Sequence, residues 1–382
     1  MTDIGYNDNL AINGRKFHIQ TSTNVKRGTA QCEIFEEGKL INLEQIRFER
    51  RQQKTEQGLQ KRIDSMVRSL HEETSNEIEL LFEIAEKVKK LRHAPSNVKI
   101  GLIFLHNNLT KDAIEHFEIA LSINPESIQA MKNLGKAYLQ TDNTHKAIHI
   151  LQRALRNNDQ YPDLHLSMAI AYIDQKQYYK ALNHLQTALK INPDYNEARY
   201  YQIILYLASA IHDKSDSMLP PPSIRLNRVQ QQLDTLAQTP LQNFITLKKQ
   251  IENLLKENQI GKALEVLKHQ HKNIFHPEPV SLIGMDFYLK FMYGGTGMRD
   301  SLIKNFERKL QDVLEQNEEF ADLWNNLGIV HLIQCRNLFL RALSEFDKAL
   351  EINPAFEKAK KNKKLVENDG KEFLILLRAI LR

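Results

Sequence analysis

The chain has 382 residues, enough for two or three domains with cores of their own. Its 14 glycines and 11 prolines are near half the usual shares of about 7 % and 5 %, which predicts a mainly α fold and excludes collagen-like, disordered Pro/Gly-rich and turn-rich all-β chains. A net charge of +5, made of residues of both signs, is milder than most nucleic-acid binders carry, so no specific nucleic-acid partner is expected.

The N-terminal segment 1–43 is predicted to be a small three-stranded antiparallel β module. Apolar and polar residues alternate around Phe17 and Ile19, and again around Cys32 and Ile34, which is the period of a strand. The strands are expected at 15–21, 29–36 and 39–43. A sheet of this size buries too little apolar surface to be stable alone. We therefore expect it to pack on the next segment or on a second copy of itself.

Residues 44–93 are highly charged, and their pattern of apolar residues predicts a long helical segment. Apolar residues recur every three or four positions, with a slip in the pattern near Thr74. Two interpretations stay open at this point. The segment is either one unbroken helix or a two-helix hairpin that bends at 74–76.

A repeat with a period of 34 residues starts at Ala94 and starts again at Ile128, Pro162 and Asn196. In the first three copies position 8 is glycine or alanine and positions 20 and 27 are alanine, and in all four copies position 11 is aromatic. A small residue at position 8 lets two helices cross closely, and a proline after the second helix ends it. Three clear copies and half of a fourth are therefore predicted over 94–211.

These features resemble the tetratricopeptide repeat, whose pattern is W-x2-L-G-x2-Y, then A-x3-F, A and P. The resemblance implies an α-solenoid of helical hairpins whose first helices line a concave surface that binds proteins. The residues that carry it are Gly101, Phe104, Ala113, Phe117, Ala120, Pro125, Gly135, Tyr138, Ala147, Ala154, Ala169, Tyr172, Ala181, Ala188, Pro193, Trp324, Gly328, Ala342, Phe346, Ala349 and Pro354.

A second block of repeats is predicted after a Pro-rich linker at 212–223. It is expected to hold two degenerate copies, the first with Ile251 at position 8, and one clear copy that turns between its helices near 334–338. The ranges are 224–354 for the block, 244–277 and 280–317 for the degenerate copies, 321–354 for the clear copy and 355–382 for a C-terminal capping helix.

No catalytic or cofactor-binding motif stands out, so the sequence predicts a protein that is not an enzyme and needs neither cofactor nor metal. The glycine-rich loop at 294–297 lacks the Gly-Lys-Ser/Thr ending of a phosphate-binding loop, and we interpret it as a turn. His145 and His149 share one helix face near Asp142, but on an open surface, so we interpret them as solvated. The same interpretation applies to His269, His271 and His276.

The C-terminal segment joins a run of lysines at 358–364 to an apolar stretch at 373–381. We favour a helix that caps the last repeat with its apolar face and turns its lysines to water. The alternative is contact with an anionic membrane surface.

In the tetratricopeptide family, repeat positions 2, 5, 9, 12 and 13 line the partner groove. The corresponding residues here are Leu102, Gln129, Lys132, Lys136, Gln140, Asp163, Leu166, Ile170, Asp174, Glu197 and Tyr200. They run from basic in the second copy to acidic and aromatic in the third and fourth. A partner segment with an acidic end and a basic or apolar end would suit them.

We therefore expect a cytoplasmic scaffold or adaptor that binds a peptide or helix of another protein in this groove. Cys32 and Cys335 lie in different modules, which favours a reducing compartment, and neither a leader nor a membrane-spanning stretch is apparent. The alternatives are a membrane-peripheral assembly factor recruited by the C-terminus and a regulatory subunit of an enzyme complex. Self-association stays open.

Overall fold

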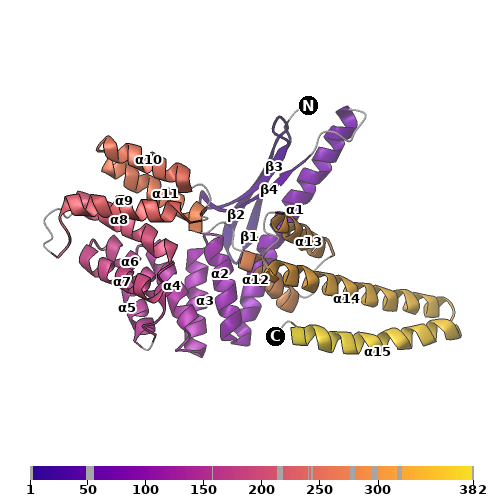
Figure 1. Cartoon of the computed structure of the whole chain (residues 1–382). Helices are drawn as coiled ribbons and strands as arrows, with labels where there is room; N and C mark the ends of the chain where they lie inside the picture. The colour runs from indigo at the N-terminus through magenta and orange to yellow at the C-terminus, as the bar shows by residue number, and fades with distance from the viewer. Residues whose placement is uncertain are drawn as a thin grey trace. The chain divides into compact units, whose positions relative to one another are not determined.

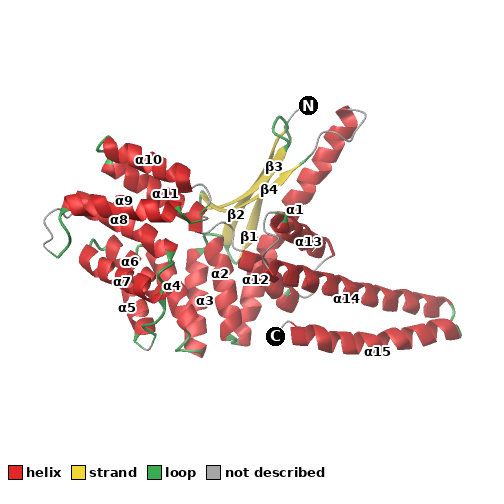
Figure 2. Cartoon of the chain, viewed as in Figure 1, coloured by secondary structure: helices red, strands yellow, loops and turns green. Residues whose placement is uncertain are grey.

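The computed structural model describes residues 3–48, 56–156, 158–212, 218–239, 241, 244–275, 280–294, 300–315 and 321–380. Over these residues the fold is mainly α, with fifteen helices after a four-stranded sheet (Figures 1 and 2). The chain divides into two compact units. Unit 1 consists of Met1–Leu91 and Val280–Arg382, and unit 2 of Arg92–Pro279. The repeat block is thus inserted between two segments that fold together, whereas the sequence suggests modules that simply follow one another.

Unit 1 begins with an antiparallel sheet in the order β1-β2-β3-β4. The strands are β1 (Gly5–Ile12), β2 (Arg15–Asn24), β3 (Thr29–Glu36) and β4 (Lys39–Arg47). The prediction of three strands is wrong, because β1 is an additional edge strand and β4 continues past residue 43. β1 has Asn7, Asp8 and Asn9 at its centre, residue types that are depleted in strands. The Asn13–Gly14 pair, with φ of 51° and 79°, forms the tight turn between β1 and β2 and was the available sequence signal.

Helix α1 (Glu56–Leu91) packs on one face of this sheet. That face is made by alternate residues such as Phe17 and Ile34, which are fully buried, and the Phe17 ring lies 5.5 Å from the Phe82 ring of α1. Of the two interpretations of the charged segment, the unbroken helix is correct. Thr74, at the slip in the pattern, is buried and its hydroxyl donates to the Leu70 carbonyl at 2.7 Å. The helix thereby keeps a polar residue on its buried face without bending.

A buried polar chain links the sheet to α1. Thr21 Oγ1 lies 2.7 Å from His71 Nδ1 and donates to Cys32 Sγ at 3.0 Å. His71 Nε2 in turn lies 2.9 Å from an Asp8 carboxylate oxygen. Burial raises the pKa of the Cys32 thiol. Thr21, Cys32 and His71 lie inside the packed interface, whereas the Asp8 side chain lies at its exposed edge, and together they fix how α1 is positioned on the sheet.

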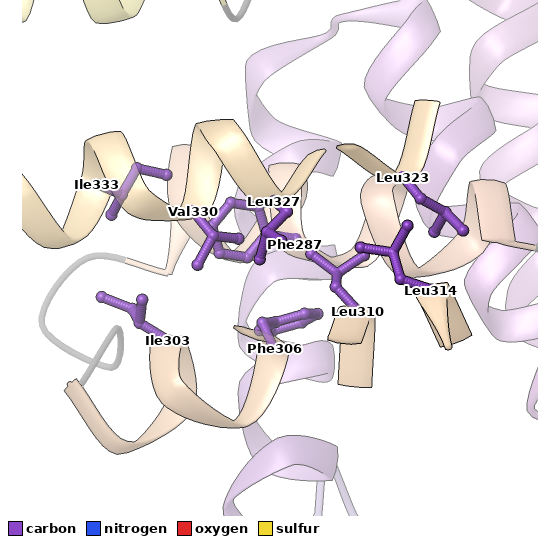
Figure 3. Packing of buried hydrophobic residues seen from close by; sticks show 9 residues of the cluster. All are labelled: Phe287, Ile303, Phe306, Leu310, Leu314, Leu323, Leu327, Val330 and Ile333. Carbon is purple, nitrogen blue, oxygen red and sulfur yellow. The ribbon is translucent and has the colours of Figure 1, made fainter. Parts of the chain in front are cut away.

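The C-terminal part of unit 1 contains four helices, three of which surround a cluster of apolar side chains (Figure 3). The helices are α12 (Val280–Tyr293), α13 (Asp300–Leu314), α14 (Ala321–Ile352) and α15 (Glu357–Ile380). The buried members of the cluster are Phe287, Ile303, Phe306, Leu310, Leu314, Leu323, Leu327, Val330 and Ile333. They join α12 and α13 to the N-terminal half of α14.

Buried ion pairs connect the two segments of unit 1. Lys290 of α12 lies 2.8 Å from Asp286 and 3.8 Å from Glu77 of α1, and its side chain is only 4 % exposed. Lys309 of α13 lies 3.0 Å from Glu44 of β4 and 3.9 Å from Glu77. Burial alone would raise the pKa of Glu77, but the charges of the two lysines bring it below its usual value. Residues far apart in the chain are thereby held in one arrangement.

Helix α14 is one helix of 32 residues and not the hairpin that its repeat signature predicts. The expected turn near 334–338 is helical, and α14 packs against α15 as its partner. Trp324 is 53 % exposed, and a Cβ added to Gly328 would meet no atom within 4 Å. The prediction of a clear repeat at 321–354 is therefore wrong, because the close contact that position 8 makes in a hairpin is missing.

Unit 2 confirms the tetratricopeptide-like hairpins. Their helices are α2 (Ala94–His106), α3 (Thr110–Ile123), α4 (Ile128–Gln140), α5 (Thr144–Leu155), α6 (Pro162–Asp174), α7 (Tyr178–Ile191), α8 (Asn196–His212) and α9 (Pro222–Ala237). A Cβ on Gly101 would lie 2.6 Å from the Phe117 ring, and one on Gly135 would lie 2.8 Å from Leu151. Ala113, like the other signature alanines of 94–195, is fully buried. The small residues therefore have the packing role that the resemblance implies.

The Pro-rich segment joins the two helices of the fourth hairpin, so it is not a linker between blocks. Helix α9 packs on α8, and Arg225 at its start is fully buried. Arg225 donates to the carbonyls of Pro220 and Ser209, at 2.6 and 3.0 Å. Residues 213–217 of the predicted linker lie outside the described residues.

Alanine substitutions at two signature glycines are expected to change stability in opposite directions. Gly328→Ala should stabilise the protein by about 0.5–1 kcal/mol, because the site is open and α14 is straight. Gly135→Ala should destabilise it by about 1–3 kcal/mol, because the new methyl group clashes with Leu151. Urea unfolding followed by circular dichroism measures both. Equal losses of stability in the two variants would contradict the open site at Gly328 on an unbroken α14.

Removal of the buried Lys290 ammonium group is expected to lower the stability of unit 1. Lys290→Met leaves Asp286 without its ion-pair partner and Glu77 with Lys309 alone, and should lower the free energy of unfolding by about 3 kcal/mol. The double variant Lys290→Met/Asp286→Asn should lose less, because the carboxylate left without a partner is then neutral. Thermal unfolding of unit 1 that is unaltered by Lys290→Met would show that the two segments do not depend on this cluster.

Candidate functional site

The first helices of the successive hairpins, α2, α4, α6 and α8, pack side by side in unit 2. Their outward residues at the predicted groove positions form one surface, which we call the first-helix face. Lys132 of α4 shows the alignment directly, because its Nζ lies 3.0 Å from a carboxylate oxygen of Asp163 on α6. Regular hairpin packing thus brings the same side of each first helix together.

The structure places the predicted groove residues in three classes. Exposed are Gln129, Gln140, Asp163 and Asp174, and half-buried are Leu102, Lys132, Lys136, Ile170 and Glu197. Leu166 and Tyr200 are buried, with 4 % and 0 % of their surface accessible. Their side chains are enclosed by this chain's own helices, so contact of these two residues with a partner stays a prediction.

A charged cluster occupies the centre of the first-helix face. Lys132 pairs with Asp163, and the Tyr195 hydroxyl hydrogen-bonds to the same carboxylate. Lys136 lies one turn further along α4, where burial lowers its pKa and the charge of Glu197 partly opposes that shift. Lys136 makes no hydrogen bond or ion pair with any other described residue. A poorly solvated ammonium group of this kind favours an anionic group on whatever covers it.

The α8 part of the face is covered by α11 (Ile260–Phe275), the second helix of the hairpin that begins with α10 (Phe244–Lys256). The Tyr200 hydroxyl donates to the Leu267 carbonyl at 2.7 Å, and its ring meets the Phe275 ring edge-on at 5.2 Å. Burial accordingly raises the pKa of Tyr200. Tyr200 binds a helix, as the sequence suggests, but the helix belongs to the same chain.

His271 of α11 makes the polar contacts with α8. Its Nε2 lies 3.0 Å from a Glu197 carboxylate oxygen, and its ring packs edge-on against Tyr201 at 4.9 Å. The interpretation of His271 as a solvated residue is therefore wrong. Leu267, His271 and Phe275 follow one another at intervals of four, a helix-face pattern that was the available signal for this contact.

The hairpin of α10 and α11 packs differently from the earlier ones. In the earlier copies the second helix of one hairpin packs on the first helix of the next, whereas here α11 lies on α8, and α10 and α11 contact each other less extensively than the two helices of the other hairpins do. Ile251 stands at position 8 of α10 and is fully buried, but Ile203 stands at position 8 of α8, which packs closely on α9. The residue at position 8 therefore does not by itself set this arrangement.

A buried histidine pair lies inside the third hairpin. His165 Nδ1 and His184 Nδ1 are 2.9 Å apart, and the His184 ring stacks on Tyr172 at 5.6 Å. Burial and the neighbouring His165 lower the pKa of His184 to about 4. The second hairpin has Met131 and Ile150 at the same two repeat positions. The pair is thus a polar variant of a core contact.

Other candidate groups give no site. Within the described residues, no three or more His, Cys, Asp or Glu side chains come together as metal ligands. His145 and His149 are exposed, and His145 Nδ1 lies 3.3 Å from the Gln175 side-chain amide. His276 and positions 295–297 of the glycine loop lie outside the described residues.

The lysine run of α15 is largely exposed. The exposed members are Lys358, Lys360, Lys361 and Lys364, whereas Lys363 is half-buried and pairs with Asp347 of α14. The side chains of the apolar stretch at 373–381 lie outside the described residues, so the cap and the membrane contact both stay predictions. No helix within the described part of the chain is long and apolar enough to span a bilayer.

Comparison with known proteins agrees with the repeat fold. A family model for subunit 3 of the anaphase-promoting complex, cyclosome, matches residues 106–188. Together with the observed hairpins, this match identifies the block as tetratricopeptide-type repeats. Comparison with the curated proteins gives no significant match.

Three solved structures illustrate the fold similarity. MamA is 19 % identical, with 48 % of this chain and 99 % of that chain covered and a TM-score of 0.36. YrrB, described as a tetratricopeptide repeat protein with an unusual peptide-binding site, is 18 % identical, with 55 % and 97 % covered and a TM-score of 0.33. A tetratricopeptide repeat protein from Parabacteroides merdae is 19 % identical, with 72 % and 98 % covered and a TM-score of 0.33.

The stability of unit 2 is expected to fall as the pH drops from 6.5 toward 4. His184 is neutral in the folded state in that range, whereas the unfolded chain takes up a proton, so acid favours unfolding. Allowing for the partial exposure of the ring, the loss is on the order of 1 kcal/mol. His165→Met/His184→Ile, which copies the second hairpin, should flatten the dependence of the melting temperature on pH. An unchanged slope would contradict this assignment.

Proposed function

We propose that the protein is a non-enzymatic scaffold whose first-helix face binds a peptide or helical segment of a partner protein. The observation that carries the proposal is the packing of α11 on α8. We call the surface of α8 that α11 covers the seat. There the face already holds a helix through a hydrogen bond, an ion pair and aromatic contacts. The parts of the face on α2, α4 and α6 continue from that seat.

The chemistry of the remaining face indicates what it would bind. Leu102 and Ile170 are half-buried apolar residues that a partner can cover, which supplies the non-directional part of the affinity. Lys136 would fix the orientation of the partner, since a carboxylate of the partner would form a charge-assisted hydrogen bond with this poorly solvated ammonium group. We infer a partner segment with apolar side chains and at least one acidic residue.

We also propose that the scaffold acts in the cytoplasm. Cys32 and Cys335 are both thiols outside any disulfide, with Cys32 buried, and this supports a reducing compartment.

The proposal is tested by charge reversal at Lys136, with Lys190 as the matched control. Lys190 is an exposed lysine on α7, a second helix, and so lies outside the first-helix face. Partners would be captured with the full chain as bait, identified by mass spectrometry, and their dissociation constants measured with purified proteins. Lys136→Glu is expected to weaken binding at least tenfold, because it replaces an attraction by a repulsion. Lys190→Glu should leave the affinity unchanged.

Two results would refute the proposal. One is a set of partners and affinities unaffected by Lys136→Glu in a variant whose melting temperature matches the natural protein. The other is equal weakening by both substitutions, which would indicate a general effect of charge.

A further inference from the structure

We infer that α11 is an internal ligand of the first-helix face and that it shows the class of partner this face takes. That class is an amphipathic helix with a leucine, a histidine or other basic residue, and a phenylalanine at successive intervals of four. The inference rests on the proposed function, because it names the partner class for the same surface. It adds that α11 and such a partner compete for the seat on α8.

The residues of α11 that contact α8 form one line along the helix. Leu267, His271 and Phe275 are spaced by four, which puts them on the same side. The Leu267 side chain is fully buried, and its backbone carbonyl accepts the hydrogen bond from the Tyr200 hydroxyl at 2.7 Å. The His271 and Phe275 rings then pack on Tyr200 at 5.8 and 5.2 Å. These three positions carry the contacts with Tyr200 that a partner helix would have to reproduce.

Charge complementarity supports a basic occupant at this end of the face. His271 lies 3.0 Å from Glu197, whose side chain is only 16 % exposed. Lys268, on the next turn of α11, is near enough to Asp174 of α6 for its charge to oppose the rise that burial causes in the pKa of Asp174. Besides Glu197, the charged groups that act on Lys136 are Lys132 and Asp163, which pair with each other. Basic residues of α11 thus face the acidic part of the face.

Helix α11 packs less extensively on its own first helix than the other second helices of unit 2 do on theirs. It contacts α8, in contrast, through Leu267, His271 and Phe275. Much of what holds α11 is therefore its contact with α8. A helix that offers the same groups can take over that contact.

The experiment uses the full chain and a fluorescein-labelled peptide of the natural sequence 260–275 as the probe, with binding measured by fluorescence anisotropy. In the natural chain α11 fills the seat, so binding should be weak. His271→Glu places two carboxylates opposite each other and should release α11, so that the peptide binds at least tenfold more tightly. His271→Gln is the matched control, since it keeps a polar side chain without the repulsion.

A compensating variant makes the test specific for the seat. Adding Glu197→Lys to His271→Glu restores an opposite-charge pair between α8 and α11, so peptide binding should return to the level of the natural chain. Hydrogen exchange of α11 should rise in His271→Glu and fall again in the double variant. If His271→Glu lowers the helix content, Phe275→Ala serves as the releasing variant, because it removes the ring contact with Tyr200 instead.

The inference is overturned if the folded releasing variants bind the peptide no more tightly than the natural chain. It is also overturned if α11 stays as protected from exchange as α8 in those variants, which would make α11 a permanent part of the solenoid. Neither result depends on an external partner, whereas the proposed function is tested at Lys136 with such a partner. The two can therefore fail separately.

Discussion

The close crossing of two helices at repeat position 8 is the contact on which the arrangement of this protein depends. At Gly101 and Gly135 there is no room for even a methyl group beside the facing Phe117 and Leu151. That closeness packs each hairpin tightly and brings the first helices side by side. This packing forms the first-helix face. It places Lys132 of α4 beside Asp163 of α6, and Glu197 of α8 lies further along the same face.

The chain departs from the regular arrangement in two places. In the hairpin of α10 and α11, which has Ile251 at position 8, the second helix lies on α8, where it covers Tyr200 and Glu197. At Gly328 a Cβ would meet no atom within 4 Å, and α14 is one helix of 32 residues that packs on α15. The first departure places a helix of this chain on the first-helix face, and the second makes the predicted last repeat part of unit 1.

The repeat block could be predicted from the sequence because its signature residues act locally, within 34 residues. Strand β1 was not predicted because Asn7, Asp8 and Asn9 are residue types that strands rarely contain. It is an edge strand that pairs with β2 alone. The insertion of unit 2 into unit 1 could not be predicted, because it depends on pairs such as Glu44 with Lys309, which no local pattern connects. The partner role of the groove positions stays a prediction, and the cover of α11 over Tyr200 could not be predicted, because a sequence pattern does not show which helix covers a residue.

The α8 part of the first-helix face holds a helix, and in this chain that helix is α11. The most direct measurement is photo-crosslinking from position 201 in the full chain, with a benzophenone amino acid in place of Tyr201, followed by mass spectrometry. Because the Tyr201 and His271 rings lie 4.9 Å apart, the account predicts an intramolecular adduct within residues 260–275. Adducts confined to α6, with none on α11, would contradict it.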